Sequence, residues 1–124
     1  MPGSMKRLVA LPLLLLALAA AACGGGDDGE GGASSEACPS GSVEIKMIDV
    51  KFDPQEATAD VGQAVCWINE DTIDHNAVAE SGADFKSELY GKGETFTTTI
   101  DTPGTVEYVC TVHPGMTGTL TVAR

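Results

Sequence analysis

Basic side chains are scarce in this 124-residue sequence. Seven Lys and Arg stand against 18 Asp and Glu, which gives a formal net charge of −11 at pH 7. A chain of this charge repels phosphates and anionic lipid headgroups, so its composition argues against a nucleic-acid-binding surface. Attraction to a basic protein partner remains open. We expect most of the acidic side chains to form a solvated surface that keeps the chain soluble.

Histidine is scarcer still, and helical periodicity is missing. The only two histidines are His75 and His113, which excludes any centre that needs more than two imidazoles. After residue 23 no segment has the apolar pattern of a long helix, and internal repeats are not evident. The part of the chain after residue 23 is therefore expected to be mainly β-structure.

The first predicted strand changes phase along its length. Apolar residues alternate from Val43 to Met47, and the alternation then continues one residue out of step from Ile48 to Phe52. A shift of one residue sends side chains to the opposite face, so the pattern predicts a bulge or bend near Met47. The pair Asp53-Pro54 ends this strand.

Further short segments have the composition of strands separated by turns. These β-branched or alternating segments are 58–60, 64–69, 96–100, 105–109 and 117–122. Residues 81–90 fit either a helical turn or an irregular loop. We predict one all-β domain over residues 38–124, built as a sandwich or barrel.

The N-terminus has the organisation of an export signal. Lys6 and Arg7 precede an apolar run from Leu8 to Ala22, which is too short to be a comfortable membrane span. We therefore expect residues 1–22 to be a signal peptide and Cys23 to become the first residue. The export predicted here places the domain outside the cytoplasm.

The residues around the predicted cleavage site resemble a bacterial lipoprotein box. The match is Ala20-Ala21-Ala22-Cys23, although the family more often has a larger aliphatic residue at the position of Ala20. This resemblance implies lipid on Cys23 and anchoring to the extracytoplasmic face of a bacterial membrane. The alternative is ordinary secretion with Cys23 left as a spare thiol. Residues 23–37, rich in glycine and acidic side chains, are expected to form a flexible tether.

Three candidate metal ligands lie close together near the C-terminus. Cys110, His113 and Met116 follow one another at three-residue intervals directly after a predicted strand, and His75 lies upstream. Two imidazoles, one thiolate and a weak axial thioether are the ligands of a blue-copper electron-transfer centre. Each residue alone has a more ordinary explanation, such as packing or a buried thiol, but the joint pattern favours one copper ion cycling between Cu(I) and Cu(II). Zinc could occupy the same ligands without redox activity.

From Ser42 to Ala123 the chain resembles a cupredoxin of the plastocyanin and amicyanin group. The motifs that carry this resemblance are Phe52-x-Pro54, Val61-Gly62, Val65-x-Trp67-x-Asn69, Asp74-His75-Asn76 and Cys110-x-x-His113-x-x-Met116. The resemblance implies a Greek-key β-sandwich with copper at one end, held by His75, Cys110, His113 and Met116. The short ligand loop is similar to that of amicyanin, and Val112 departs from it where amicyanin has proline.

The resemblance also implies roles for residues around the ligands. Asn76 is expected to tie the His75 loop to the Cys110 loop by hydrogen bonds. An apolar patch at Val112, Pro114 and Gly115, where the edge of His113 reaches the surface, is expected to receive redox protein partners. The domain is expected to be monomeric.

The same resemblance bears on the remaining cysteines. In the family the first and third strands lie side by side, and Cys38 precedes the first while Cys66 lies in the third. If Cys23 carries lipid and Cys110 binds copper, an exported chain is expected to pair Cys38 with Cys66. Two buried free cysteines, or either of the other pairings, remain open.

Three classes of function compete for these residues. The favoured one is a shuttle that passes single electrons between extracytoplasmic redox partners. A module that stores or delivers copper is the second, but the Met-rich and His-rich tracts expected of it are absent. An enzyme is the third. Cys110 and His113 could be taken for a nucleophile and its base, but metal ligation accounts for both and no separate catalytic cluster is evident.

Overall fold

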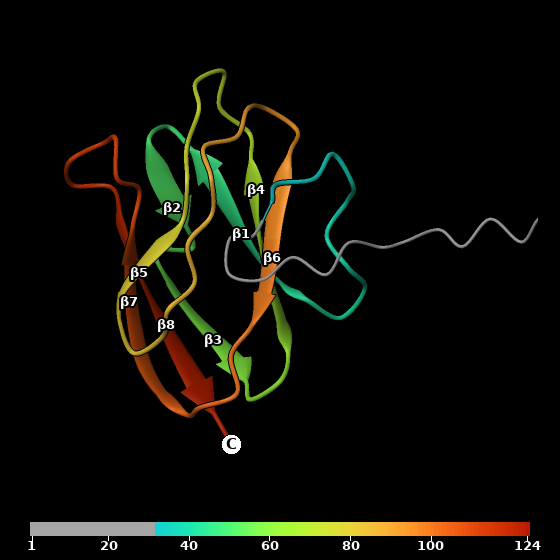
Figure 1. The fold of residues 1–124 in the computed structure, drawn as a ribbon, viewed down its shortest axis with the longest axis vertical. Coiled ribbons are helices and arrows are strands. Elements are labelled where there is room, and N and C mark those ends of the chain that lie inside the picture. The colour runs from blue at the N-terminus through green and yellow to red at the C-terminus, as the bar shows by residue number, and fades with distance from the viewer. Residues whose placement is uncertain (1–31) are drawn as a thin grey trace, which may run out of the picture.

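The computed structural model describes residues 32–124 as two four-stranded β-sheets packed face to face (Figure 1). The strands are β1 (Val43–Ile48), β2 (Lys51–Asp53), β3 (Glu56–Asp60), β4 (Ala64–Asn69), β5 (Val78–Ser81), β6 (Thr95–Thr99), β7 (Gly104–Val109) and β8 (Thr117–Ala123). One sheet has the order β2-β1-β4-β6 and the other β3-β8-β7-β5. The predicted signal peptide, the lipidation site Cys23 and the first part of the tether lie outside the described residues.

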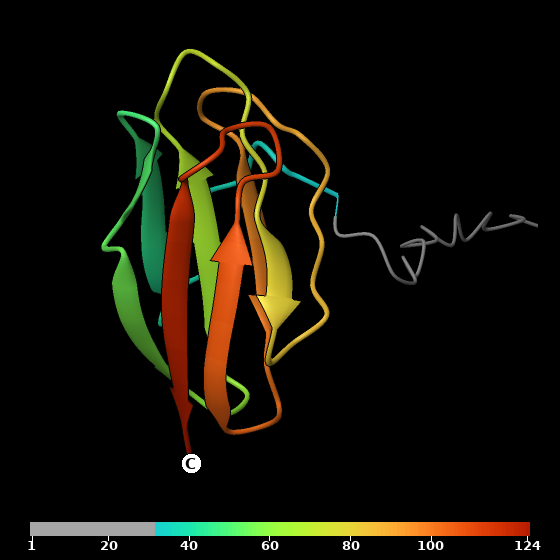
Figure 2. The same cartoon turned by 90° about the vertical axis from the view of Figure 1, so that its left-hand side faces the viewer.

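Both sheets mix parallel and antiparallel pairs because the chain crosses repeatedly from one to the other. β1 pairs in parallel with β4, and β3 pairs in parallel with β8, whereas the other pairs are antiparallel. Figure 2 shows the second sheet from its outer side, with β8, β7 and β5 next to one another. The predicted all-β sandwich is confirmed.

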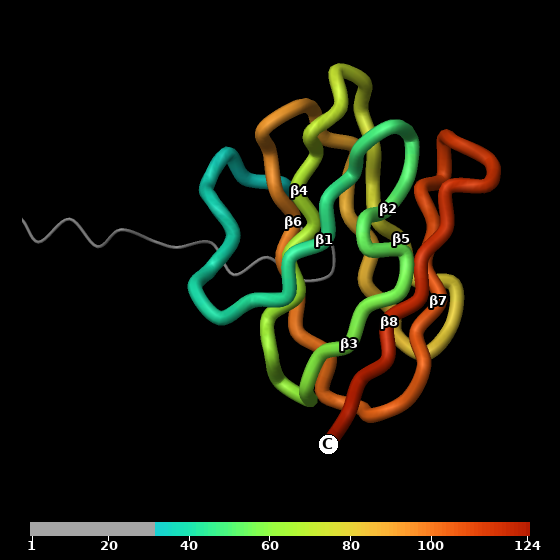
Figure 3. The backbone as a smooth tube through the Cα atoms, turned by 180° about the vertical axis from the view of Figure 1, so that it is seen from behind, coloured from blue at the N-terminus to red at the C-terminus, as the bar shows by residue number. Residues whose placement is uncertain are grey.

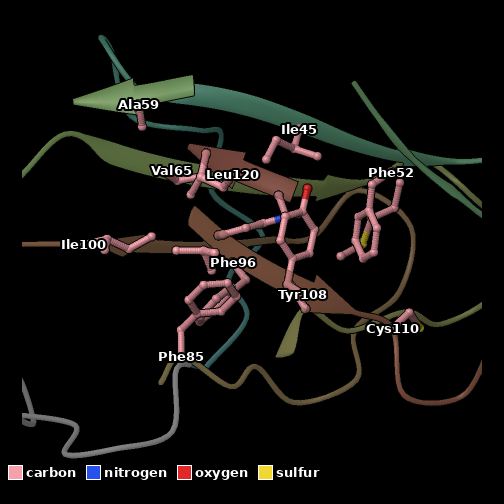
Figure 4. Close-up of a cluster of buried hydrophobic side chains, with 14 of the residues drawn as sticks. Ile45, Phe52, Ala59, Val65, Phe85, Phe96, Ile100, Tyr108, Cys110 and Leu120 are labelled. Carbon is pink, nitrogen blue, oxygen red and sulfur yellow. The ribbon is translucent and has the colours of Figure 1, made fainter. Parts of the chain in front are cut away.

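Aromatic rings fill the space between the sheets (Figure 4). Trp67 of β4 lies at the centre, with ring centroids 5.3 Å from Tyr108 and 5.7 Å from Phe96. Tyr108 also contacts Phe52, at 4.7 Å between centroids. Each such side chain stabilises the fold by roughly 1.5–3 kcal/mol through removal of apolar surface from water. Cys110 lies at the edge of this cluster, which also includes Met116, so the core directly supports two of the predicted ligand positions.

The hydroxyl end of Tyr108 lies over the backbone of Gly118, its partner in the β7–β8 ladder. A Cβ atom at residue 118 would overlap the Tyr108 ring, which Trp67 and Phe52 prevent from moving aside. Glycine is therefore required here for close approach rather than for a turn. This contact fixes the ends of β7 and β8, between which the ligand loop runs.

The change of phase near Met47 marks a hairpin, so the predicted bulge or bend is wrong. Met47 pairs with Phe52 across β1 and β2, and the turn residues Asp49 and Val50 have φ of 53° and 57°. Two successive left-handed residues reverse the chain in a tight hairpin, so the second apolar set is divided: Ile48 ends β1, Val50 lies in the turn and Phe52 lies on β2. Val50 is consequently 41% exposed instead of packed.

The other expected strands lie within a residue or two of their predicted bounds, and one further strand is present. β5 was not predicted, and its last residue is the first of the segment 81–90, for which a helical turn or an irregular loop was expected. The remainder of that segment crosses to β6 without a regular strand or a helix. Within residues 32–124 the structure contains no helix long and apolar enough to cross a membrane.

A disulfide between Cys38 and Cys66 attaches the segment before β1 to β4, as expected, with a Cα–Cα distance of 5.7 Å. Ahead of Cys38, Ser34 and Thr95 exchange backbone N–H···O bonds of 2.8 Å and 2.7 Å. Figure 3 shows this segment, residues 32–41, passing beside β4 and β6. The structure thus places the last residues of the predicted tether, which extended to residue 37, against the domain. We call residues 32–41 the N-terminal strap.

Candidate metal centre

Three potential metal donors converge where two loops meet at one end of the sandwich. His75 lies in the β4–β5 loop, Cys110 directly follows β7, and His113 lies in the β7–β8 loop. Both loops are at the upper end of the molecule in Figure 1. His75 Nδ1 is 3.7 Å from Cys110 Sγ and 3.2 Å from His113 Nδ1, and Cys110 Sγ is 3.4 Å from His113 Nδ1. Two imidazoles and one thiol therefore face a common point.

The three donors differ in their access to water. His75 is 0% exposed and Cys110 is 3% exposed, whereas His113 is half-buried. No other group of at least three His, Cys, Asp or Glu side chains within residues 32–124 has a geometry that could hold a metal ion. The arrangement therefore shields the thiol while one imidazole edge reaches the surface.

Backbone hydrogen bonds close the loop that carries Cys110, His113 and Met116. The Met116 N–H donates to the His113 carbonyl, and the Cys110 N–H donates to the Met116 carbonyl, both at 3.0 Å. Met116 is 2% exposed, so its side chain is inside the protein. The distances above thus join three of the four predicted ligands, and the fourth, Met116, belongs to the same closed loop as Cys110 and His113.

Asn76 joins the two loops at the position that the resemblance assigned to it. Its Nδ2 donates to Thr111 Oγ1, and the Thr111 N–H donates to Asn76 Oδ1, both at 2.8 Å. Because Asn76 and Thr111 each follow a candidate ligand directly, these two bonds fix His75 relative to Cys110. Such outer contacts hold the ligands in place before the metal binds.

A family model described as copper binding proteins of the plastocyanin/azurin family matches residues 39–123. The chain belongs to this family. Its donor set fits copper on chemical grounds, because one thiolate with two imidazoles is what a blue-copper ion requires and all three donor atoms lie within 4.8 Å of one another.

Relatives in this copper-binding family are similar in sequence and in structure. Amicyanin-alpha of Methylorubrum extorquens is 33% identical over 91 residues, which cover 70% of this chain and 76% of the relative. Plastocyanin of Scenedesmus fuscus is 35% identical over 83 residues, which cover 57% of this chain and 85% of that protein. The solved Cu(I) form of an amicyanin variant matches with a TM-score of 0.66 at 28% identity, covering 72% of this chain and 89% of its own.

One residue of the copper site was not found from the sequence. The Asp71 carboxylate accepts a hydrogen bond of 2.7 Å from His75 Nε2, four residues along the same loop. Burial acts to raise the pKa of this carboxyl, but hydrogen bonds from the Val50 N–H, His75 and the Asp49 N–H hold it below its ordinary value. Asp71 was overlooked because it is one of 18 acidic residues and two of its three donors are backbone groups distant in sequence.

Tyr90 supports the His75 backbone from the other side. The two residues exchange backbone hydrogen bonds of 3.2 Å and 2.9 Å, and the Tyr90 hydroxyl donates to the Trp67 carbonyl at 3.1 Å. Burial, together with the nearby Cys110 and Glu94, raises the pKa of the Tyr90 phenol well above its usual range. Tyr90 therefore stays neutral and connects the ligand loop to the core.

The residues expected to receive partners lie at the surface of the ligand loop. Val112 is 47% exposed, and Pro114 and Gly115 are exposed on the other side of the half-buried His113. Val112, Pro114 and Gly115, which we call the rim, are thus accessible from solvent on either side of His113 in the chain.

Proposed function

We propose that this protein binds one type 1 copper ion through His75, Cys110, His113 and Met116 and carries single electrons between redox partners. The observation that carries this proposal is the convergence of His75 Nδ1, Cys110 Sγ and His113 Nδ1 at one end of a cupredoxin sandwich. When bound, copper supplies the one-electron Cu(II)/Cu(I) couple. The relatives' membership of the same family, with a solved Cu(I) form of amicyanin, supports this assignment.

The protein's own contribution is to restrain the donor atoms and to exclude water from them. Asn76 and the closed 110–116 loop restrain the ligands by hydrogen bonds, and the burial of His75 and Cys110 keeps water from their donor atoms. Because the ligand positions are fixed before electron transfer, the site needs little structural change when the electron is gained or lost. Of the two imidazoles, His113 is the one that is only half-buried, so electrons are proposed to enter and leave through it.

The colour of the copper-loaded protein tests this function. We expect Cu(II) to produce an intense visible absorption band that bleaches with ascorbate and returns on oxidation, because the Cys110 thiolate bonds covalently to the metal. The measurement is a titration of the metal-free protein with Cu(II), with Zn(II) as the colourless control. Stoichiometric Cu(II) binding without the band would contradict the proposal and favour copper storage or delivery.

We further propose that the carrier works outside the cytoplasm, anchored by lipid on Cys23 and held off the membrane by the residues before the strap. The support is the order of the segments, with Lys6, Arg7 and an apolar run directly before Cys23. Partners are proposed to dock on the exposed rim of Val112, Pro114 and Gly115 around His113.

The anchor has a direct test in a bacterial host. The Cys23→Ser variant lacks the acceptor thiol, so we expect it to move from the membrane fraction to the soluble exported fraction. Fractionation followed by mass spectrometry of the N-terminal peptide is the measurement, and Ser35→Ala is a matched control that should stay with the membrane. Equal membrane retention of the Cys23 variant would contradict lipid anchoring.

A further inference from the structure

The Asp71 carboxylate connects the copper end to a turn with an unusual backbone. Asp49 and Val50 have φ of 53° and 57°, a left-handed conformation that β-branched residues rarely adopt. Their N–H groups donate to Asp71 Oδ1 at 2.8 Å and to Oδ2 at 3.0 Å. A strained backbone of this kind persists only where its surroundings impose it, and it concentrates at functional sites. The carboxylate therefore holds the β1–β2 turn in place and is itself fixed by it.

The same carboxylate determines which nitrogen of His75 carries a proton. Asp71 Oδ2 can only accept, so the 2.7 Å contact requires a hydrogen on His75 Nε2. In the neutral ring Nδ1 is then unprotonated, and Nδ1 is the atom that faces Cys110 Sγ and His113 Nδ1. The His75 side chain is 0% exposed and that of Asp71 is 15% exposed, so water offers little competition for this bond.

We infer that Asp71, held by the two turn N–H groups, is a positioning residue that fixes the tautomer and ring orientation of His75 and lowers the reduction potential of the copper ion. This inference rests on the proposed copper site. A carboxylate that accepts from the far nitrogen of a ligating imidazole makes the ring a stronger donor. A stronger donor and a nearby negative charge both stabilise Cu(II) more than Cu(I). The β1–β2 turn thereby becomes part of the copper site without touching the metal.

The Asp71→Asn variant of the copper-loaded protein tests the inference. The amide keeps the size of the side chain but removes the charge and cannot accept from all three donors. We expect the equilibrium between Cu(II) and Cu(I) to shift at least tenfold toward Cu(I), which for a one-electron couple is about 59 mV in the reduction potential. Redox titration against a mediator measures the shift, while the visible band reports that the thiolate remains bound.

Asp74→Asn is the matched control, because Asp74 is exposed and lies three residues further along the same loop. It removes the same charge near His75 but leaves the Asp71 hydrogen bonds intact. We therefore expect the equilibrium between Cu(II) and Cu(I) to shift by less than about threefold, through the screened Coulomb interaction alone. Equal shifts in the two variants would show a general charge effect and overturn the inference, as would an unchanged potential in Asp71→Asn.

A measurement on the unsubstituted protein covers the case in which Asp71→Asn does not fold. In the diamagnetic Cu(I) state, the His75 Nε2–H is expected to give a proton NMR signal that exchanges slowly with water. A signal lost to rapid exchange would overturn the inference even though the blue band of the oxidised protein was present. Absence of that band in the unsubstituted protein would instead reject the copper site itself, so the two failures are distinct.

Discussion

Replacing Cys110 with alanine is expected to abolish the intense visible band of the copper-loaded protein. Cys110 Sγ lies near both imidazoles, 3.7 Å from His75 Nδ1 and 3.4 Å from His113 Nδ1. Loss of a contact outside the ligands typically costs 10–100-fold in metal affinity, so loss of the thiolate should exceed about 100-fold. Visible spectra and a competitive Cu(II) titration of Cys110→Ala measure both effects.

Met116→Leu is the control for this result, because it changes another buried residue of the same loop and keeps the thiolate. We expect its band to persist and its reduction potential to rise, since the weak axial ligand tunes the potential rather than creating the colour. An undiminished visible band in the Cys110→Ala variant would contradict the assignment of the ligands, regardless of the band and the reduction potential of Met116→Leu.

The strands could be predicted from the sequence where the local pattern and the final packing agree. In β4, Val65 and Trp67 alternate with residues on the opposite face, and the predicted bounds 64–69 are those of the structure. The β1–β2 turn was missed because the sequence there is Asp49-Val50, without the Asn-Gly signal of a tight hairpin. The conformation of this turn depends on Asp71, more than twenty residues away, and no local pattern contains that information.

In the candidate site, the metal ligands could be recognised from the sequence, whereas the residues that position them could not. The spacing of Cys110, His113 and Met116 after a strand was visible, as was His75, because thiolate, imidazole and thioether are rare and specific donors. Asp71 carries a common side chain whose partners are mostly backbone N–H groups. Residues 32–37 of the strap were likewise expected to belong to the tether, because Ser34 binds β6 through its backbone, which any sequence could offer.

Removing the Cys38–Cys66 disulfide is expected to have the largest effect on stability. Cys66 is 0% exposed but lies outside the core cluster, on the other face of β4 from Trp67, so alanine there leaves the sandwich core intact. The dominant loss is the constraint on the unfolded chain across a sequence separation of 28 residues. On the chain-entropy model that constraint contributes roughly 3–4 kcal/mol, a large part of the total stability of a small domain.

Urea unfolding of the metal-free Cys38→Ala/Cys66→Ala variant measures this loss, with Ser35→Ala as a control because Ser35 is an exposed residue of the same strap. The strap should also loosen, since it would lose its covalent attachment to β4. It would then be held only by hydrogen bonds, such as the Ser34–Thr95 backbone pair and the bond from the Gln63 amide to the Gly41 carbonyl, and by the packing of Ala33. We therefore expect faster hydrogen exchange at the Ser34 N–H in the variant, together with an unchanged visible band after copper loading. An unfolding free energy within about 1 kcal/mol of the unsubstituted protein would show that the strap contacts already restrict the unfolded chain, contrary to the entropic account.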